Sequence, residues 1–280
     1  MGRPSNEGAS PLVFGLLAIV TALLAARGYG VAAVVIGGLA IVTPLERLRP
    51  RRRQRFLRRA LNADLMHALV SLPLAFVVGL GPLALASWLL PPLPTVGEAI
   101  ASAPVLVQAV IALLLLEFVA YWTHRLQHEV PILWRFHRVH HSSEELDWLA
   151  GVRVHPLAAL FVKSFEALPL ALIGIELSVS APVAFFALVS GLLTHANVDL
   201  RLRPLRRLWV TPDFHHWHHA DEPDAIDTNY SGLLPLWDLV FGTYHLPDDR
   251  LPERYGIDGG DPATWWGHMK LPFRAQPRSH

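Results

Sequence analysis

Apolar runs with few charged residues recur along this chain. Six of them cover residues 11–26, 31–42, 65–90, 105–121, 157–175 and 181–193. Apolar stretches of this kind are typical of helices that lie in the hydrocarbon core of a bilayer. The pattern therefore predicts an all-α fold, in which six helical elements form a multi-pass membrane helical bundle.

The first two runs are short for complete spans, and only residues 27–30 separate them. We expect them to form a helical hairpin that is inserted fully or in part. A secretory signal is the alternative for the first run, because Arg3 precedes it and small residues follow it. The second run follows almost at once, which favours the hairpin.

Eight arginines lie between residues 46 and 59, directly after the second run. Arginine-rich loops stay on the cytoplasmic side of a membrane, so this loop orients the whole bundle. Counting spans from it places both termini, the segment after the fourth run and the basic stretch 201–207 on the cytoplasmic side. We expect an integral protein of the cell inner membrane in that orientation.

Composition narrows the chemistry that is open to the chain. Hydrophobic residues make up 52% of the 280 positions and charged residues 17%, against about 25% in an average soluble domain. The 24 basic and 23 acidic side chains leave a net charge of +1, which removes the electrostatic basis for binding nucleic acid. Cysteine is absent, so thiolate zinc sites and iron–sulfur clusters are excluded. No glycine-rich dinucleotide fingerprint follows a predicted strand, and we expect no bound organic cofactor.

Histidine is the exception to this composition, with fifteen residues, most of them in two short stretches. Five of them fall among the eighteen positions 124–141, where an even distribution would place about one. Residues 137–141 and 215–219 each contain histidines at positions i, i+3 and i+4, and His124 and His128 are spaced i, i+4. On a helix these spacings place the rings on one face. His155 and His195 stand alone in the sequence.

Histidines that share a helical face are suited to metal binding, because neutral imidazole is the most common nitrogen ligand of transition metals. One ion takes about four to six ligands, so eight to ten histidines indicate two ions close together. The ligand type leaves zinc, copper, iron and nickel open. The sequence lacks the Glu-x-x-His pairs of carboxylate-bridged di-iron bundles.

The strings HRLQH, WRFHRVHHS, THANV and HHWHHA occur in this order between residues 113 and 245. They resemble the sterol desaturase and fatty acid hydroxylase superfamily of integral-membrane oxygenases. The resemblance implies a cytosolic histidine-rich di-metal cap with two iron (Fe) ions per chain, which uses dioxygen to attack a C–H bond of a lipid. Zinc (Zn) is expected to replace iron in part of the purified protein.

The resemblance also implies a set of metal ligands. His216 is an extra histidine inside the last motif, H-x-x-H-H, and is left out of the set. His155, which lies outside the motifs, is included as a tenth member. The implied ligands are His124, His128, His137, His140, His141, His155, His195, His215, His218 and His219.

By this resemblance the chain is a lipid hydroxylase or desaturase, and the motifs do not separate the two reactions. Its partners are then a membrane lipid, dioxygen and an external electron donor. The expected organisation is a set of N-terminal transmembrane helices with the basic loop over residues 1–112, a fatty acid hydroxylase-like catalytic domain over 113–246 and an irregular surface tail over 247–280. No catalytic side chain is expected beyond the two-metal centre.

Carboxylates often fix the orientation of a metal-bound imidazole, so acidic residues near the histidines are candidates for this role. These candidates are Glu117, Glu129, Glu144, Asp147, Asp199, Asp213 and Asp227.

Two other functions compete with an oxygenase. A zinc-dependent membrane hydrolase would need a motif such as H-E-x-x-H, but the only His–Glu step, at His128, has Ile132 where the second histidine would stand. A metal transporter or store would place its ligands near the middle of the spans. The histidines instead lie at the ends of apolar runs and in the segments predicted to be cytoplasmic.

Overall fold

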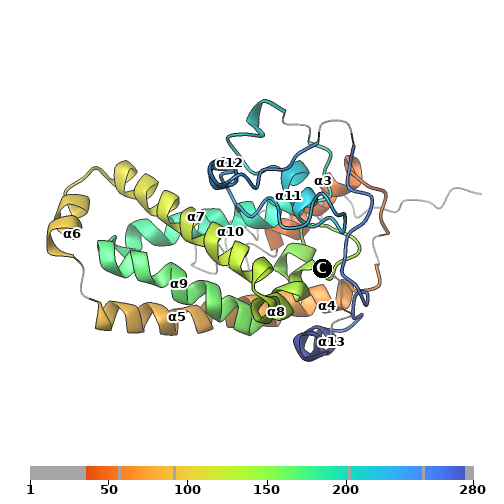
Figure 1. Cartoon of the computed structure of the whole chain (residues 1–280), viewed down its shortest axis with the longest axis horizontal. Coiled ribbons are helices and arrows are strands. Elements are labelled where there is room, and N and C mark those ends of the chain that lie inside the picture. The colour runs from red at the N-terminus through yellow and green to blue at the C-terminus, as the bar shows by residue number, and fades with distance from the viewer. Residues whose placement is uncertain (1–35, 56–57, 91–92, 201–202, 248–249, 275–280) are drawn as a thin grey trace, which may run out of the picture.

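The structure, a computed structural model, describes residues 36–55, 58–90, 93–200, 203–247 and 250–274 (Figure 1). Within these ranges it is all-helical, as predicted, with two isolated β-bridges and no strand. The elements are η1 (Gly38–Val42), α3 (Thr43–Leu48), α4 (Leu61–Met66), η2 (His67–Ser71), α5 (Leu72–Leu89), α6 (Pro94–Ala101), α7 (Val105–Glu129), α8 (Pro131–His141), η3 (Ala150–Val152), α9 (Pro156–Ile173), α10 (Leu177–Thr194), η4 (Arg203–Leu205), α11 (Pro212–His218), α12 (Leu236–Phe241), α13 (Trp265–Lys270) and η5 (Leu271–Phe273).

Four of the six predicted apolar runs form long helices. The third run forms α4, η2 and α5, and the fourth, fifth and sixth form α7, α9 and α10. Two helical stretches, Leu61–Ala86 and Val105–Glu129, are long and apolar enough to cross a membrane, and Ser178–Thr194 is a shorter apolar helix. The first run and residues 31–35 of the second lie outside the described residues.

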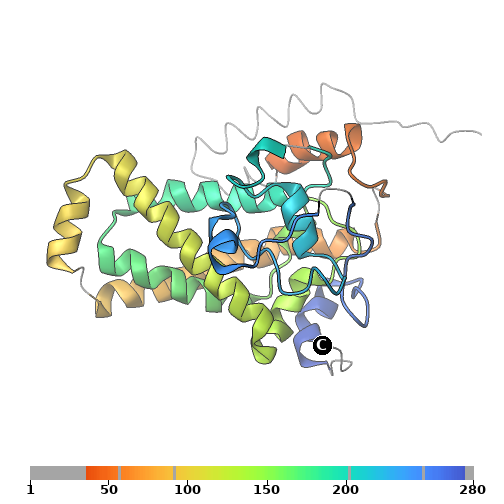
Figure 2. The same cartoon turned by 45° about the horizontal axis from the view of Figure 1, so that its top comes forward.

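The helices α5, α7, α9 and α10 run side by side as a bundle (Figures 1 and 2). The bundle leaves large apolar side chains uncovered, such as Trp88 on α5, which is 79% exposed, and Leu106 on α7, which is 76% exposed. Large apolar surfaces of this kind indicate a lipid or protein environment rather than water.

A proline ends the longest helix and turns the chain toward the metal-binding segment. Val130 has an extended conformation between α7 and α8, and Pro131 occupies the first turn of α8. Proline disfavours a helical conformation in the preceding residue and lacks the N–H that would continue the helix, but it fits a first turn. The helix α8 therefore folds back against α7, and the histidines at the end of α7 face those of α8.

The segments after α10 gather over this same end of the bundle. In Figures 1 and 2 the segments drawn from cyan to blue gather toward the end of the bundle opposite α6. The helix α11 contacts α10, α12 contacts α7, and α13 contacts α4. This arrangement places the histidine-rich segments at one end of the apolar bundle.

Two of the eight arginines in the predicted basic loop are buried in ion pairs. Arg51 pairs with Asp213 of α11, and Arg58 pairs with Asp64 and, at 2.7 Å, with Asp147. Both arginine side chains are less than 4% exposed. These two residues therefore tie the loop to the histidine-rich end, a structural role that the charge pattern did not indicate.

The C-terminal segment differs from the predicted irregular surface tail. It contains α13, which Thr264 caps by accepting a hydrogen bond from the Gly267 N–H, and it buries His268 completely. The indole of Trp265 donates a hydrogen bond to the Ser71 hydroxyl at 2.9 Å. The Pro-, Gly- and Asp-rich composition is typical of the turns before α13, but it does not predict these contacts with the bundle.

Candidate metal centre

Five histidines form a first group at the junction of α7, α8 and α11. Their ligand nitrogens all lie within 4.8 Å of one another. The spacings in the sequence explain how the group assembles, because α7 and α8 each present two of these rings on the face where the two helices meet. The members of the first group are His124, His128, His137, His141 and His218.

Four histidines form a second group beside the first. The Nε2 atom of His195 lies 2.9 Å from that of His215 and 3.1 Å from those of His140 and His219. His195 follows the last turn of α10 and packs against Gly151, where a Cβ atom would come within 2.8 Å of the ring. A glycine at position 151 therefore makes room for the second group.

The two groups are neighbours. The ring of His141, from the first group, stacks on that of His219, from the second, with centroids 4.3 Å apart. Two ions held by the two groups would thus lie close together, as the number of histidines in the sequence suggested.

The chemistry of the rings fits metal ions in both groups. Metal–nitrogen bonds of about 2.0–2.1 Å at right angles place adjacent ligand nitrogens about 3 Å apart, close to the Nε2 separations in the second group. In the first group the Nε2 atoms of His128, His141 and His218 are buried without a hydrogen-bond partner. Buried nitrogens without a partner are costly unless another group binds them, and a metal ion would satisfy all three.

Burial keeps these imidazoles neutral, which is the form that binds metal. Desolvation lowers the pKa of His195 to about 4. Desolvation, together with the neighbouring imidazoles, lowers the pKa of His137, His215 and His219 well below the usual 6.5.

This direction of the pKa shifts predicts how the metal-free protein responds to acid. The unfolded chain takes up protons below about pH 6.5, whereas the folded chain resists protonation, so stability is complete above this pH and is lost as the pH falls through it. We expect the unfolding temperature of the metal-free protein to be level from pH 8 to 7 and to fall steeply below about pH 6.5. An unfolding temperature that stays constant down to about pH 5 would contradict the conclusion that these buried imidazoles are neutral.

Backbone carbonyl groups orient four of the nine rings. The Nδ1–H of His124 donates to the Tyr230 carbonyl at 2.7 Å, and that of His218 donates to the Thr228 carbonyl at 2.8 Å. The Nδ1–H of His195 donates to the carbonyl of Gly191 at 2.7 Å. Fixing Nδ1 in this way directs Nε2 toward the metal position.

Among the candidate carboxylates, Asp227 lies beside a ligand ring, 3.7 Å from Nδ1 of His128. Glu117 instead accepts hydrogen bonds from the N–H groups of Leu233 and Leu234 at 2.8 and 3.0 Å. It anchors the chain that follows Tyr230 rather than a ring.

Sequence reasoning missed a second anchor of this chain. Asp238, on α12, is fully buried and accepts hydrogen bonds from the N–H groups of Tyr230 and Ser231 at 2.8 and 2.9 Å. It therefore fixes the peptide whose carbonyl holds His124. A lone aspartate eight residues beyond Tyr230 gives no sequence signal for this role.

His155 and His216 lie outside both groups. The prediction of His155 as a ligand is not supported, because its Nδ1 accepts a hydrogen bond from the Leu157 N–H at 3.2 Å and so caps α9. His216 instead contacts the Tyr255 hydroxyl and the backbone of His195. The nine histidines of the two groups are thus the predicted set without its tenth member.

The cap role predicts a mild effect for His155→Ala. Losing a helix N-cap costs about 0.5–2 kcal/mol, so we expect slightly lower stability and full metal content, with stability recovered in His155→Asn. Metal analysis and thermal unfolding would check this result. Loss of one ion per chain in both variants would return His155 to the ligand set.

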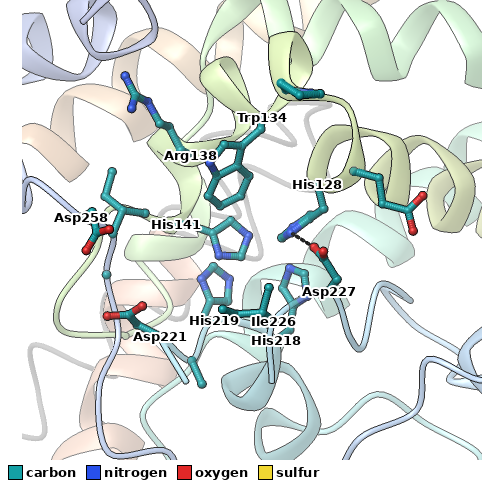
Figure 3. A pocket seen from close by; sticks show the side chains of 15 residues that line it. His128, Trp134, Arg138, His141, His218, His219, Asp221, Ile226, Asp227 and Asp258 are labelled. Carbon is teal, nitrogen blue, oxygen red and sulfur yellow. Dashed lines mark ion pairs between the residues drawn. The ribbon is translucent and has the colours of Figure 1, made fainter. Parts of the chain in front are cut away.

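A cavity of about 320 Å³ opens beside the two groups (Figure 3). His128, His141 and His218 of the first group and His219 of the second line it, and Trp134 lies over the ring of His141. Its other walls combine apolar residues, such as Ile226 and Ile257, with three aspartates at positions 221, 227 and 258. The cavity gives a small molecule direct access to both groups.

Comparison with known proteins agrees with this geometry. The model of the fatty acid hydroxylase family matches residues 109–243, which include all nine grouped histidines. The segment 109–243 belongs to this family. No solved structure matches the chain.

The fatty acid hydroxylase segment also has named relatives. An ornithine lipid hydroxylase of Rhizobium tropici is 37% identical over 62% of this chain and 53% of its own length. An alkylglycerol monooxygenase of Homo sapiens is 36% identical over 58% of this chain and 35% of its own. A very-long-chain aldehyde decarbonylase of Oryza sativa is 33% identical over 53% of this chain and 24% of its own length. The chain thus spans about half of the first relative and less of the other two.

Proposed function

We propose that this chain is a membrane-bound non-haem di-iron oxygenase that hydroxylates, or desaturates, a C–H bond of a membrane lipid. The observation that carries the proposal is the pair of adjacent all-imidazole groups at the end of an apolar helical bundle, within a fatty acid hydroxylase segment. The names of two relatives, an ornithine lipid hydroxylase and an alkylglycerol monooxygenase, favour a lipid substrate and dioxygen as the oxidant.

The nine grouped histidines would hold two iron ions, five around one and four around the other. When bound, iron supplies the oxidising power for C–H cleavage, which no side chain possesses. Imidazole ligands also suit zinc, which is the expected contaminant in purified protein. The electrons must come from an external donor.

The protein's own contribution is to orient ligands and to position the substrate. The carbonyl groups of Tyr230, Thr228 and Gly191 hold ligand rings in place, which lowers the cost of assembling the centre. The cavity offers the substrate a position against both groups, with Trp134 as an apolar wall. A reactive carbon held there is fixed in orientation relative to the metals, and a filled cavity excludes water.

The apolar bundle supports an integral multi-pass topology for this enzyme. The exposed apolar faces of α5 and α7 would lie in the inner membrane, and the histidine-rich end would form a cap on the cytoplasmic side together with both termini. A reporter fused after the last residue is then expected to be cytoplasmic.

The reaction can be tested with purified, iron-loaded protein in detergent. Bacterial membrane lipids, an ornithine lipid and an alkylglycerol would be supplied separately with a chemical reductant and isotopically labelled dioxygen. We expect one of these lipids to gain one labelled oxygen atom or to lose two hydrogens, and His219→Ala to give no product. Unchanged lipids with a fully loaded centre would contradict the proposal, and release of a fatty acid without label would favour a hydrolase.

A further inference from the structure

The C-terminal segment, defined here as residues 255–273, lies beyond the fatty acid hydroxylase segment yet supports the metal centre. It is packed against the protein, with Tyr255 and Leu271 each less than 8% exposed. Two hydrogen-bonded routes lead from it to histidines, and both end at the second group.

The first route runs through His216 to His195. The Nε2–H of His216 donates to the carbonyl oxygen of His195 at 3.2 Å, so Nδ1 is the bare nitrogen and accepts the hydrogen bond of the Tyr255 hydroxyl at 3.0 Å. His216 is 1% exposed. Tyr255 also forms an isolated bridge with Ala220, the residue after His219. This route therefore restrains two members of the second group.

The second route runs through Arg153 to His140. One carboxylate oxygen of Asp261 lies 3.0 Å from the Arg153 guanidinium, and the Arg153 carbonyl accepts the Nδ1–H of His140 at 3.2 Å. Asp64 binds the same guanidinium. The side chain of Arg153 is completely buried, so its conformation depends on these two carboxylates.

A pair of buried histidines fixes Asp261 in turn. The Nδ1 atom of His67 accepts from the Val154 N–H at 3.4 Å, so its Nε2–H donates to Nδ1 of His268 at 2.9 Å. The Nε2–H of His268 then donates to Asp261 at 2.9 Å. Both rings are fully buried, and every nitrogen in the pair has a partner. Satisfied networks of this kind hold their members rigidly.

The first group is held by a different part of the chain. Tyr230, Thr228 and Asp227, which bind or face the rings of His124, His218 and His128, all lie within the fatty acid hydroxylase segment. The C-terminal segment also meets α8, where Arg138 donates to the Leu271 carbonyl, but the Arg138 side chain points away from His141 (Figure 3).

We propose that the C-terminal segment positions the second histidine group, through Tyr255 and His216 on one route and Asp261 and Arg153 on the other, and sets its metal affinity separately from that of the first group. This inference rests on the proposed two-metal centre. Tyr255, His216, Asp261 and Arg153 are positioning residues in this account, because they act on the ligands and not on the metal.

Two backgrounds separate the sites in the experiment. His218→Ala weakens metal binding by the first group, so that binding by the second group can be measured. His219→Ala weakens metal binding by the second group, so that binding by the first group can be measured. Tyr255→Phe and Asp261→Asn are introduced into each background, and the metal-free full-length proteins are titrated with Co²⁺ under anaerobic conditions. Cobalt absorption reports occupancy, affinity and ligand geometry without any need for turnover.

We expect Tyr255→Phe and Asp261→Asn to weaken Co²⁺ binding by about 10–100-fold when the second group is measured, and by less than about 3-fold when the first group is measured. Asp227→Asn is the matched control and is expected to show the opposite selectivity. For the His216 route, His216→Gln retains a donor near the Nε2 position and should recover affinity that His216→Phe loses.

Equal weakening of both groups, or no change in either, would overturn the inference. Equal weakening would mean that the C-terminal segment only stabilises the fold, and unfolding temperatures of the same variants would record that loss. The outcome is separate from the proposed reaction: two ions bound by the unsubstituted protein with no selective change would refute the positioning role alone. Fewer than two ions bound by the unsubstituted protein would refute the two-metal centre itself.

Discussion

Replacing His218 with alanine is expected to remove metal from the first group and to abolish activity. The Nε2 atom of His218 is buried without a hydrogen-bond partner among the ligand nitrogens, and its Nδ1–H is fixed by the Thr228 carbonyl at 2.8 Å. Alanine would leave four imidazoles of the five and would not fill the vacated space. Replacing a group that only supports a ligand costs about 10–100-fold in affinity or activity, so losing a ligand should cost more. Iron content per chain and product formation would be measured together.

The other histidines in and directly after α11 provide comparisons for His218→Ala. His215→Ala and His219→Ala should lose as much activity, whereas His216→Ala should be milder, because His216 lies outside both groups. Each variant must insert into membranes as the unsubstituted protein does for the comparison to hold. Full activity of His218→Ala would remove this residue from the ligand set, and a loss in His216→Ala equal to that in His215→Ala would make His216 a ligand.

Asp238→Ala is expected to have the second largest effect, because one buried carboxylate holds the peptide that orients His124. It accepts hydrogen bonds from two backbone N–H groups and from the Thr243 hydroxyl at 2.7 Å. Leaving both N–H groups without a partner costs about 1–3 kcal/mol each and about 2–6 kcal/mol together, which lowers the unfolding temperature by about 4–24 °C. The first group should also bind metal about 10-fold more weakly. Thermal unfolding and anaerobic metal titration measure the two effects.

Asp224→Asn is the matched control for Asp238→Ala. Asp224 lies in the same part of the chain, but its side chain is 51% exposed and pairs with Arg250 at the surface. Water screens exposed ion pairs, so this variant should be close to the unsubstituted protein in stability and metal affinity. Equal behaviour of the two variants would contradict the anchoring role of Asp238.

Much of the metal centre could be predicted from the sequence because helical geometry relates residue spacing to position. The spacings within 124–128, 137–141 and 215–219 place rings on common faces, and α7, α8 and α11 present those faces to one another. Likewise, the apolar runs predicted the long helices. Local pattern was sufficient for these features, because each depends on residues close together in the chain.

The predicted role of His155 shows where residue type alone misleads. An imidazole before a helix can bind a metal or cap the helix, and the sequence does not choose between these uses. In the structure its Nδ1 is occupied by the first turn of α9. Of the predicted carboxylate partners, Asp227 lies beside the ring of His128, whereas carbonyl groups orient the rings of His124, His140 and His195. Every residue carries a carbonyl group, so no residue type in the sequence identifies these partners.

The support behind the second group was beyond prediction because its members are far apart in the chain. Arg153 binds Asp64, 89 positions earlier, and Asp261, 108 positions later. Ion pairs of this kind follow from tertiary packing, and neither charge pattern nor spacing brings such residues together.

Metal analysis of the full-length protein, reconstituted anaerobically with ferrous iron and examined by Mössbauer spectroscopy, tests the central claim most directly. The two histidine groups predict two irons per chain, present as a magnetically coupled pair after oxidation. A single iron per chain, or two irons without magnetic coupling, would contradict a di-iron centre in this protein.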